Sequence, residues 1–168
     1  MKKLVMGLIF GVSLFASRTF VSEATGYTEV GEYGRPFVIA TEDSDEQIAE
    51  EIYLGELELL AQLVEAEAGN QPFEGKCLVA DVILNRVESP DFPDTISEVI
   101  FQKNPIQFST VYNGAFEKAA WNMKESDYAA VMYEVEMHEN KEFLYFNNSP
   151  DVSGTGTPVK VGGHWFNG

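Results

Sequence analysis

The hydrophobic positions between residues 56 and 87 predict two helices joined by a short elbow. In the first segment, residues 56–68, leucine and valine side chains recur at the spacing of one helix face. The pair Gly69-Asn70 is expected to end this helix, because both residue types tolerate a left-handed backbone. The second segment, residues 74–87, is apolar on nearly every face. It is therefore expected to be a buried central helix that the rest of the chain covers.

Two glutamates near the end of the first helix are expected to point to different faces. At about 100° per residue, Glu67 falls close to the stripe of Leu60 and Val64, whereas Glu65 falls on the polar face. Glu65 is therefore expected to be a solvated surface charge. Burial and the C-terminal end of the helix dipole both raise the pKa of Glu67, as a general acid at neutral pH requires. The alternative is a glutamate at the stripe's edge that reaches water.

Residues 1–52 differ in composition from the rest of the chain. A basic start, MKK, precedes an apolar run that is short for a membrane span, which is the pattern of a secretory signal covering residues 1–24. A retained N-terminal anchor is the alternative. Residues 25–52 mix glycines with a dense acidic run and predict a leader or linker. A capping box of Ser44 and Gln47 is expected to open a short helix there, and Gly55 is expected to separate that helix from the next.

Length, charge and cysteine count exclude several classes of partner. The chain has 168 residues, which allows one domain with a real core. Its net charge of −16 repels nucleic acid and anionic membranes, so neither is an expected partner. The single cysteine, Cys77, cannot form an internal disulfide and lies in the apolar segment. We expect it to be an inert core residue.

A loop with sugar-binding character follows the central helix. Asp94 is expected to cap a short helix over residues 95–101. Residues 103–114 then show no helical period and place Gln107 and Ser109 beside the flat rings of Phe108 and Tyr112. Pyranose rings present both C–H faces and hydroxyl edges, so this combination favours a sugar site. The alternative is a packed loop with a buried Phe.

The last third of the chain changes from a helical to an extended pattern. Residues 115–123 and 126–137 predict two helices, the second with Ser126 or Asp127 at its start and with Tyr128 and Met132 on an inward stripe. Residues 143–146 and 158–161 predict short strands, and a Gly-Gly turn then leads to residues 164–166, which close the chain. The expected fold class is therefore α+β, mainly helical with a small C-terminal antiparallel sheet.

Several of these motifs occur together in one known family. The AEAGNQPFEG elbow, LNRV, the SPDFPDTI turn, the QFS loop, FLYFNN and VKVGGHWF make residues 53–166 resemble the cell wall hydrolases typified by spore cortex-lytic enzymes. The resemblance implies a lysozyme-like or lytic-transglycosylase-like domain that cleaves peptidoglycan glycan strands. It implies that the essential glutamate of the AEA element is Glu67. The family commonly has a small residue where this chain has Tyr112. The expected substrate contacts are Gln107, Phe108, Ser109, Tyr112 and Phe146.

The other residues offer little support for metal or nucleophile chemistry. His138 and His164 lie far apart and form no HExxH motif, so neither a zinc amidase nor any metal or cofactor is expected. No GxSxG motif is present, and Cys77 lies in the apolar helix. Hydrolysis normally needs a second carboxylate, which no spacing picks out. A lytic transglycosylase needs one glutamate, first as acid and then as base.

Asn85 and Arg86 interrupt the apolar second helix. Either they reach the surface at its C-terminal end, or they hydrogen-bond the following loop and brace the site. Residues 53–168 are thus expected to form a monomeric catalytic domain acting on peptidoglycan glycan strands. It would be exported to the cell wall or spore envelope without stable membrane insertion after signal cleavage. The alternatives are a hydrolytic muramidase or glucosaminidase, and a peptidoglycan-binding protein without activity.

Overall fold

The computed structural model describes residues 45–138 and 140–168. The chain divides into two units, Met1–Glu50 and Glu51–Gly168. Of the first unit only residues 45–50 are described, and they are helical. The predicted signal, most of the predicted leader and Ser44 of the predicted capping box lie outside the described residues. Nowhere in the described part of the chain does a helix combine the length and hydropathy that a membrane span needs.

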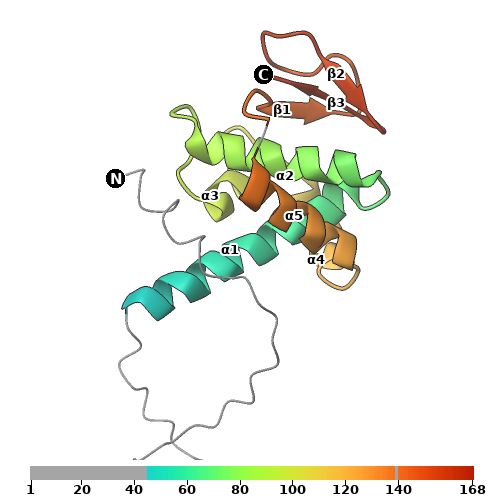
Figure 1. The fold of residues 1–168 in the computed structure, drawn as a ribbon. Coiled ribbons are helices and arrows are strands. Elements are labelled where there is room, and N and C mark those ends of the chain that lie inside the picture. The colour runs from blue at the N-terminus through green and yellow to red at the C-terminus, as the bar shows by residue number, and fades with distance from the viewer. Residues whose placement is uncertain (1–44, 139) are drawn as a thin grey trace, which may run out of the picture. The chain divides into compact units, whose positions relative to one another are not determined.

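Helices precede a small sheet along the chain, as Figure 1 shows. The elements are α1 (Asp45–Ala68), α2 (Phe73–Glu88), α3 (Ile96–Ile100), the 3-10 turn η3 (Ser109–Val111), α4 (Ala115–Ala119), α5 (Glu125–Met137), β1 (Tyr145–Asn147), β2 (Val159–Val161) and β3 (His164–Asn167). Helix α2 packs against α3, α5 and β1, so the expected central position of this helix is confirmed.

The sheet has the order β1-β3-β2, with both neighbours antiparallel to β3. Phe146 of β1 faces Phe166 of β3 in the register. Strand β1 begins two residues later than predicted. The carbonyl groups of Phe143 and Leu144 are bonded to side chains of α2 instead of to a neighbouring strand. The predicted α+β class, mainly helical with a small C-terminal antiparallel sheet, is confirmed.

Helix α1 runs through Gly55, so the predicted break at this residue is wrong. A glycine inside a helix costs only about 1 kcal/mol relative to alanine. The helix continues beyond it into the hydrophobic core, where Leu60, Leu63 and Val64 are fully buried. Burying side chains of this size contributes about 1.5–3 kcal/mol each, which outweighs the cost of the glycine.

Helix α5 is rotated relative to the stripe that the sequence predicts. Tyr128 and Met132 are exposed, and the predicted inward stripe is wrong for these two residues. Asp127 is buried instead, and its Oδ1 lies 2.6 Å from the Nζ of buried Lys76 on α2. The other carboxylate oxygen of Asp127 accepts a hydrogen bond from the backbone N–H of Lys124 at 2.7 Å. A pattern of apolar residues does not anticipate that a buried ion pair turns a charged residue inward.

Two further expectations concern single residues. The cap of α3 is Thr95, not Asp94, because the Thr95 hydroxyl accepts a hydrogen bond from the backbone N–H of Glu98 at 3.2 Å. Cys77 is buried as expected. Burial, together with the nearby Glu134 carboxylate, raises the pKa of the Cys77 thiol to about 12, so the reactive thiolate is suppressed.

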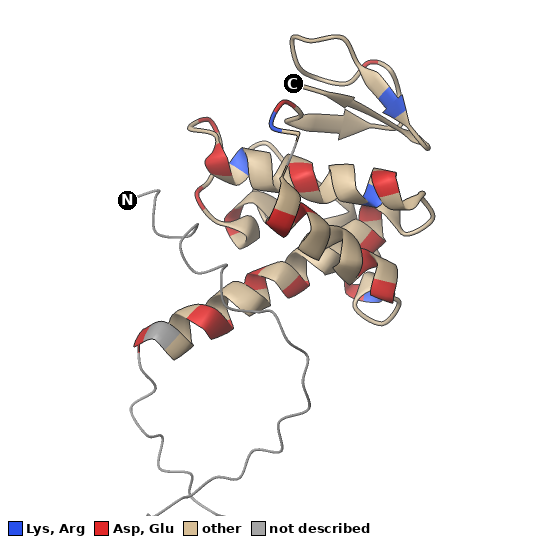
Figure 2. Cartoon of the chain, viewed as in Figure 1, with Lys and Arg blue, Asp and Glu red and all other residues tan. Residues whose placement is uncertain are grey.

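Acidic side chains are spread over the helices, whereas basic ones are few, as Figure 2 shows. A ligand that carries negative charge is therefore repelled at long range, and recognition of a polymer surface must rest on short-range contacts.

Candidate active site

A cavity of about 530 Å³ lies at the C-terminal end of α1. Its walls come from five parts of the chain: the end of α1, α2, the loop over residues 106–110, β1 with the residues after it, and the start of β3. The lining residues are Ala66, Glu67, Arg86, Ile106, Gln107, Phe108, Ser109, Thr110, Phe146, Asn147, Asn148 and His164. Segments distant in sequence are thus brought together around one carboxyl group.

Glu67 is the acidic residue of this cavity. It lies one position before the end of α1 and is half-buried. Burial raises the pKa of its carboxyl group, and a hydrogen bond donated by the Thr110 hydroxyl to Oε1 opposes part of that shift. The predicted direction of the shift is confirmed. A carboxyl group in this state is able to hold a proton nearer to neutral pH than a free glutamate does.

Glu65 points away from the cavity, so the predicted separation of the two glutamates is confirmed. The expectation that Glu65 is a solvated charge is wrong, because its side chain is only 11% exposed and lies 2.7 Å from the Nζ of Lys124. The same ammonium group also donates to the carbonyl of Gly69 at 3.2 Å. Helical phase separates the two glutamates, but it does not show that the segment before α5 folds over the polar face.

The loop over residues 106–110 supplies one wall of the cavity. Gln107 and Ser109 line it, at the positions where the sequence predicts substrate contacts. Phe108 is only 3% exposed, and its ring stacks on that of Phe146 with centroids 6.0 Å apart. This burial favours the packed-loop alternative for Phe108.

Tyr112 lies outside the cavity lining, unlike the other four predicted contacts. Its ring is 44% exposed, and its hydroxyl donates a hydrogen bond to the carbonyl of Phe101 at 2.8 Å. The turn η3 buries Val111 and carries the next residue toward the end of α3. A loop without a helical period gives no sign of this turn, so the sequence alone did not separate Tyr112 from the cavity.

Arg86 lines the cavity from α2 but is almost completely buried. Its Nε donates to the carbonyl of Leu144 at 2.7 Å, and its guanidinium carbon lies 4.9 Å from the ring centroid of Phe92 and 5.2 Å from that of Phe108. Burial lowers the pKa of the guanidinium to about 10. Of the two alternatives, bracing is the one the structure supports. Its hydrogen bond, however, goes to the segment before β1 and not to the loop after α2.

Asn147, Asn148 and His164 line the cavity, although the sequence did not predict them as substrate contacts. His164 was weighed from the sequence only as a candidate metal ligand. The available signal was a single histidine directly after a Gly-Gly turn. The spacing between His138 and His164 gave evidence only on metal binding, so it did not indicate that His164 lines a cavity by itself.

The profile of the Cell Wall Hydrolase family matches residues 70–167. The chain belongs to the cell wall hydrolase family. The spore cortex-lytic enzyme of Bacillus subtilis is 34% identical over 117 residues, which are 66% of this chain and 37% of that protein. The chain therefore spans little more than a third of the length of this curated relative.

Solved structures of this family share the fold. The catalytic domain of the germination-specific lytic transglycosylase SleB from Bacillus anthracis is 30% identical, with a TM-score of 0.54, and the match covers 67% of this chain and 93% of that one. The catalytic domain of SleB from Bacillus cereus is 31% identical with the same TM-score, and 68% and 91% of the chains are covered. The expected lytic-transglycosylase-like fold is confirmed. The family profile begins three residues after Glu67, so the glutamate itself lies outside the matched range.

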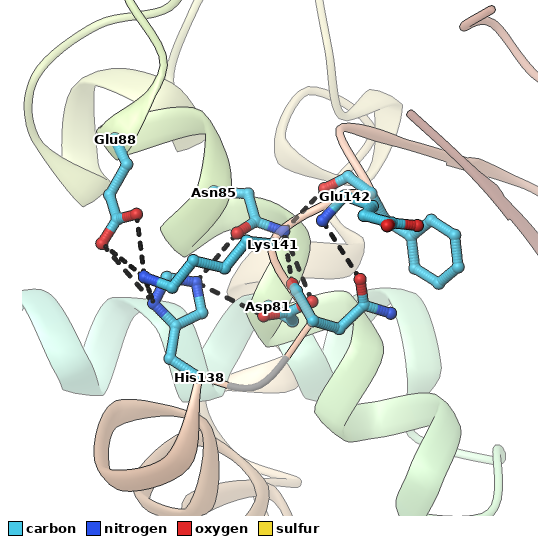
Figure 3. A network of polar contacts seen from close by, with 8 residues as sticks. Asp81, Asn85, Glu88, His138, Lys141 and Glu142 are labelled. Atoms are coloured by element: carbon cyan, nitrogen blue, oxygen red, sulfur yellow. Dashed lines mark hydrogen bonds and ion pairs between the residues drawn. The ribbon is translucent and has the colours of Figure 1, made fainter. Parts of the chain in front are cut away.

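In this member of the family, a polar network anchors the segment that leads into the cavity wall (Figure 3). The Nδ2 of Asn85 donates to the carbonyl groups of Asn140 and Phe143, both at 2.9 Å. Its Oδ1 lies 2.9 Å from the Nε2 of His138. Two adjacent residues of α2, Asn85 and Arg86, thus hold three carbonyl groups just before β1. That strand then carries Phe146 and Asn147 to the cavity.

Asp81 lies beneath this network and gives it a dependence on pH. It is fully buried, and its Oδ1 lies 3.4 Å from the Nε2 of His138. Burial, reinforced by the Glu134 carboxylate, raises the pKa of Asp81 from 3.8 to about 7. The folded protein therefore holds this proton at pH values where the unfolded chain has lost it. Between pH 3.8 and about 7 the contribution of Asp81 to the free energy of unfolding decreases as the pH rises.

Asp81→Asn is expected to remove this pH dependence. The amide keeps a polar group of the same size but does not titrate, so the stability of the variant relative to wild type should increase as the pH rises through that window. Thermal unfolding of both proteins across the window measures the difference between them. Parallel curves for the two proteins would show that Asp81 keeps the same pKa on unfolding.

Within the described residues, no three His, Cys, Asp or Glu side chains are grouped so that they could hold a metal ion. A second, smaller cavity of about 330 Å³ lies between α1 and α5, and apolar side chains such as Leu54 and Met132 line most of it. Glu58 is its acidic residue. Polar side chains therefore gather in the cavity that holds Glu67, and apolar ones in the smaller cavity.

Proposed function

We propose that this protein cleaves the glycan strands of peptidoglycan as a lytic transglycosylase, with Glu67 as its acid and base. The observation that carries the proposal is the state of Glu67. Among the described residues that line the cavity it is the single carboxylic acid, it is half-buried, and burial raises its pKa. The names of the relatives, a spore cortex-lytic enzyme and a lytic transglycosylase, support the same class of reaction.

The proposed reaction uses the Glu67 carboxyl group twice, first as an acid and then as a base. Protonated Glu67 donates its proton to the glycosidic oxygen, the bond from that oxygen to muramoyl C1 breaks, and the departing sugar leaves with a hydroxyl group. The Glu67 carboxylate then accepts the proton of the muramoyl C6 hydroxyl, whose oxygen attacks C1 and closes an anhydro ring. The carboxyl group ends protonated, and no water is consumed. The Thr110 hydroxyl, which donates to Glu67, orients the carboxylate between the two steps.

Hydrolysis is the second candidate, because it differs only in the nucleophile. An inverting or retaining glycosidase places a second carboxylate across the scissile bond. Among the described lining residues no such partner for Glu67 is present. This favours the intramolecular attack.

A peptidoglycan-binding protein without activity is the third candidate, and it would not need a carboxyl group with a raised pKa.

The proposed substrate contacts are Gln107 and Ser109, through hydrogen bonds, and Phe146, through its ring. All three line the cavity. Phe108 is proposed to act from beneath by holding Phe146 in place. Tyr112 is outside the lining and is left out of the proposed contacts.

We further propose that the protein acts as a monomer outside the cell, on the cell wall or spore cortex, after export by its N-terminal signal.

The products of digestion test this proposal directly. Purified protein is incubated with spore cortex and with vegetative peptidoglycan, and the released fragments are identified by mass spectrometry. Anhydro-muramoyl ends are expected. Reducing ends would identify a hydrolase instead, and an intact polymer that retains bound protein would identify a binding protein. The substrate that is digested faster distinguishes the two polymers.

Thr110→Val is expected to move the pH profile of cleavage. The Thr110 hydrogen bond lowers the pKa of Glu67, so its loss raises that pKa further. Activity requires protonated Glu67, and the fall in kcat/KM on the alkaline side should therefore move to higher pH. We also expect kcat/KM at the optimum to fall about tenfold, because the carboxyl group loses the partner that orients it.

Thr110→Ser is the matched control, since it keeps the hydroxyl group. It should retain the wild-type pH profile. An unchanged profile in Thr110→Val would mean that the contact with Glu67 is absent in solution.

A further inference from the structure

His164 is held at the cavity by the sheet and the aromatic residues around it. It is the first residue of β3, the central strand, and it lines the same cavity as Glu67. Its ring centroid lies 5.4 Å from that of Phe146 and 6.1 Å from that of Phe166. The residue is only 9% exposed. Its ring is therefore confined by packing, and it has little freedom to leave the cavity wall.

A direct contact fastens the turn before His164 to the elbow after Glu67. The backbone N–H of Gly163 donates to the Oε1 of Gln71 at 2.7 Å. A Cβ atom on Gly162 would lie 2.6 Å from the same oxygen and 2.9 Å from the Cδ of Pro72, so the turn is seated closely on the elbow. The contact lies four residues after Glu67 and one residue before His164. The two side chains are thus brought to one cavity by a short, direct connection.

The two ring nitrogens of His164 have different surroundings. Nδ1 is buried and has no hydrogen-bond partner among the residues that the structure describes. This leaves Nε2 as the nitrogen that reaches the cavity. Burial lowers the pKa of the imidazole, so the ring is neutral at neutral pH. A buried N–H without an acceptor is more costly than a buried lone pair without a donor, so the single proton is placed on Nε2.

We propose that His164 is a substrate-contacting residue whose Nε2–H donates a hydrogen bond to an uncharged oxygen of the glycan. This inference rests on the proposed function, because it names a contact in the same cavity. The oxygen belongs either to a 2-acetamido carbonyl or to a hydroxyl group of the sugar. A carboxylate is excluded as the target because it would favour the charged imidazolium, which needs a proton on the buried Nδ1. For the same reason His164 is a donor and not a general base.

Three substitutions separate this role from packing. Gln is able to place an amide nitrogen near the position of Nε2, Asn places one near the position of Nδ1, and Phe preserves the ring without any hydrogen bond. We make each change in the Glu67→Gln background and measure binding of a hexamer of β-1,4-linked N-acetylglucosamine by calorimetry. His164→Phe and His164→Asn are expected to weaken binding about 3- to 10-fold, the effect of one lost hydrogen bond, while His164→Gln stays within about twofold.

Two outcomes would overturn the inference. If His164→Phe binds as tightly as the parent protein, the ring acts through packing alone. If His164→Asn restores binding and His164→Gln does not, the nitrogen that contacts the glycan is Nδ1. A hexamer of β-1,4-linked glucose identifies the acceptor. If His164→Phe weakens the binding of both hexamers equally, the acceptor is a hydroxyl group. If it weakens only the binding of the acetylated hexamer, the acceptor is the acetamido carbonyl.

Nitrogen NMR of the unsubstituted His164 keeps the inference testable if the variants fail to fold. The imidazole signals of the Glu67→Gln protein should show the neutral tautomer with the proton on Nε2, and that signal should shift when the acetylated hexamer is added. A proton on Nδ1, or no shift at saturating hexamer, would overturn the inference. Cleavage by the wild-type protein is scored separately. Binding that depends on His164 without any cleavage would therefore refute the proposed function alone.

Discussion

Glu67→Gln is expected to abolish cleavage of glycan strands while glycan binding survives. The amide keeps the size of the side chain and is able to keep its contact with the Thr110 hydroxyl, but it has no proton to donate and accepts none. Losing general acid–base catalysis alone costs about 10²–10⁴-fold in rate, and the loss should reach the upper part of this range because the proposed mechanism has no other acid. Release of soluble fragments from peptidoglycan measures the rate, and co-sedimentation with the insoluble polymer measures binding.

Glu65→Gln is the matched control, two residues away on the same helix. Its side chain is paired with Lys124 outside the cavity, so the change should reduce stability slightly and leave the rate of cleavage unchanged. The reverse pattern, loss of cleavage in Glu65→Gln and retention in Glu67→Gln, would refute the assignment of the catalytic acid. Retention of activity in both would require a carboxyl group outside the described cavity.

Asp127→Asn is expected to destabilise the domain by about 3–5 kcal/mol, the usual effect of removing one partner from a buried ion pair. In the unsubstituted protein the Nζ of Lys76 lies 2.6 Å from Oδ1 of Asp127. The change leaves this buried ammonium group without its counter-ion. Within the described residues, the other hydrogen bond of this ammonium group goes to the Ser126 hydroxyl, at 2.9 Å, and neither that hydroxyl nor the amide of an asparagine carries a compensating negative charge. The free energy of unfolding of a domain of this size is about 5–15 kcal/mol, so the expected loss is a large fraction of it. Denaturant unfolding followed by circular dichroism measures the change.

The double variant Lys76→Met with Asp127→Asn tests the cause. Removing the buried cation should recover part of the stability that Asp127→Asn loses, because no uncompensated charge remains. A double variant less stable than Asp127→Asn would mean that Lys76 contributes through its own packing. A loss below about 1 kcal/mol in Asp127→Asn, the range of surface pairs, would mean that water reaches the pair.

The local pattern of the sequence determined the helices, the sheet and the face on which Glu67 lies. Periodicity reports which side of an element is apolar, and for α1 and α2 that side became the core. The same argument placed Glu67 on the inward side and predicted the direction of its pKa shift. Gln107 and Ser109 were predicted as contacts from a loop of recognisable motif, and both line the cavity.

Tertiary contacts between distant segments decided what periodicity cannot report. The pair of Lys76 with Asp127 turned a charged residue of α5 inward, and packing beyond Gly55 carried α1 through a helix-breaking residue. Burial of Phe108 and the closeness of His164 to the elbow of Gln71 depend on side chains separated by many residues in the chain. The sequence by itself shows which residues are apolar and which belong to a recognisable sequence motif. Only the folded structure shows which polar groups meet, because the energy of an ion pair or hydrogen bond depends on the distance between its partners.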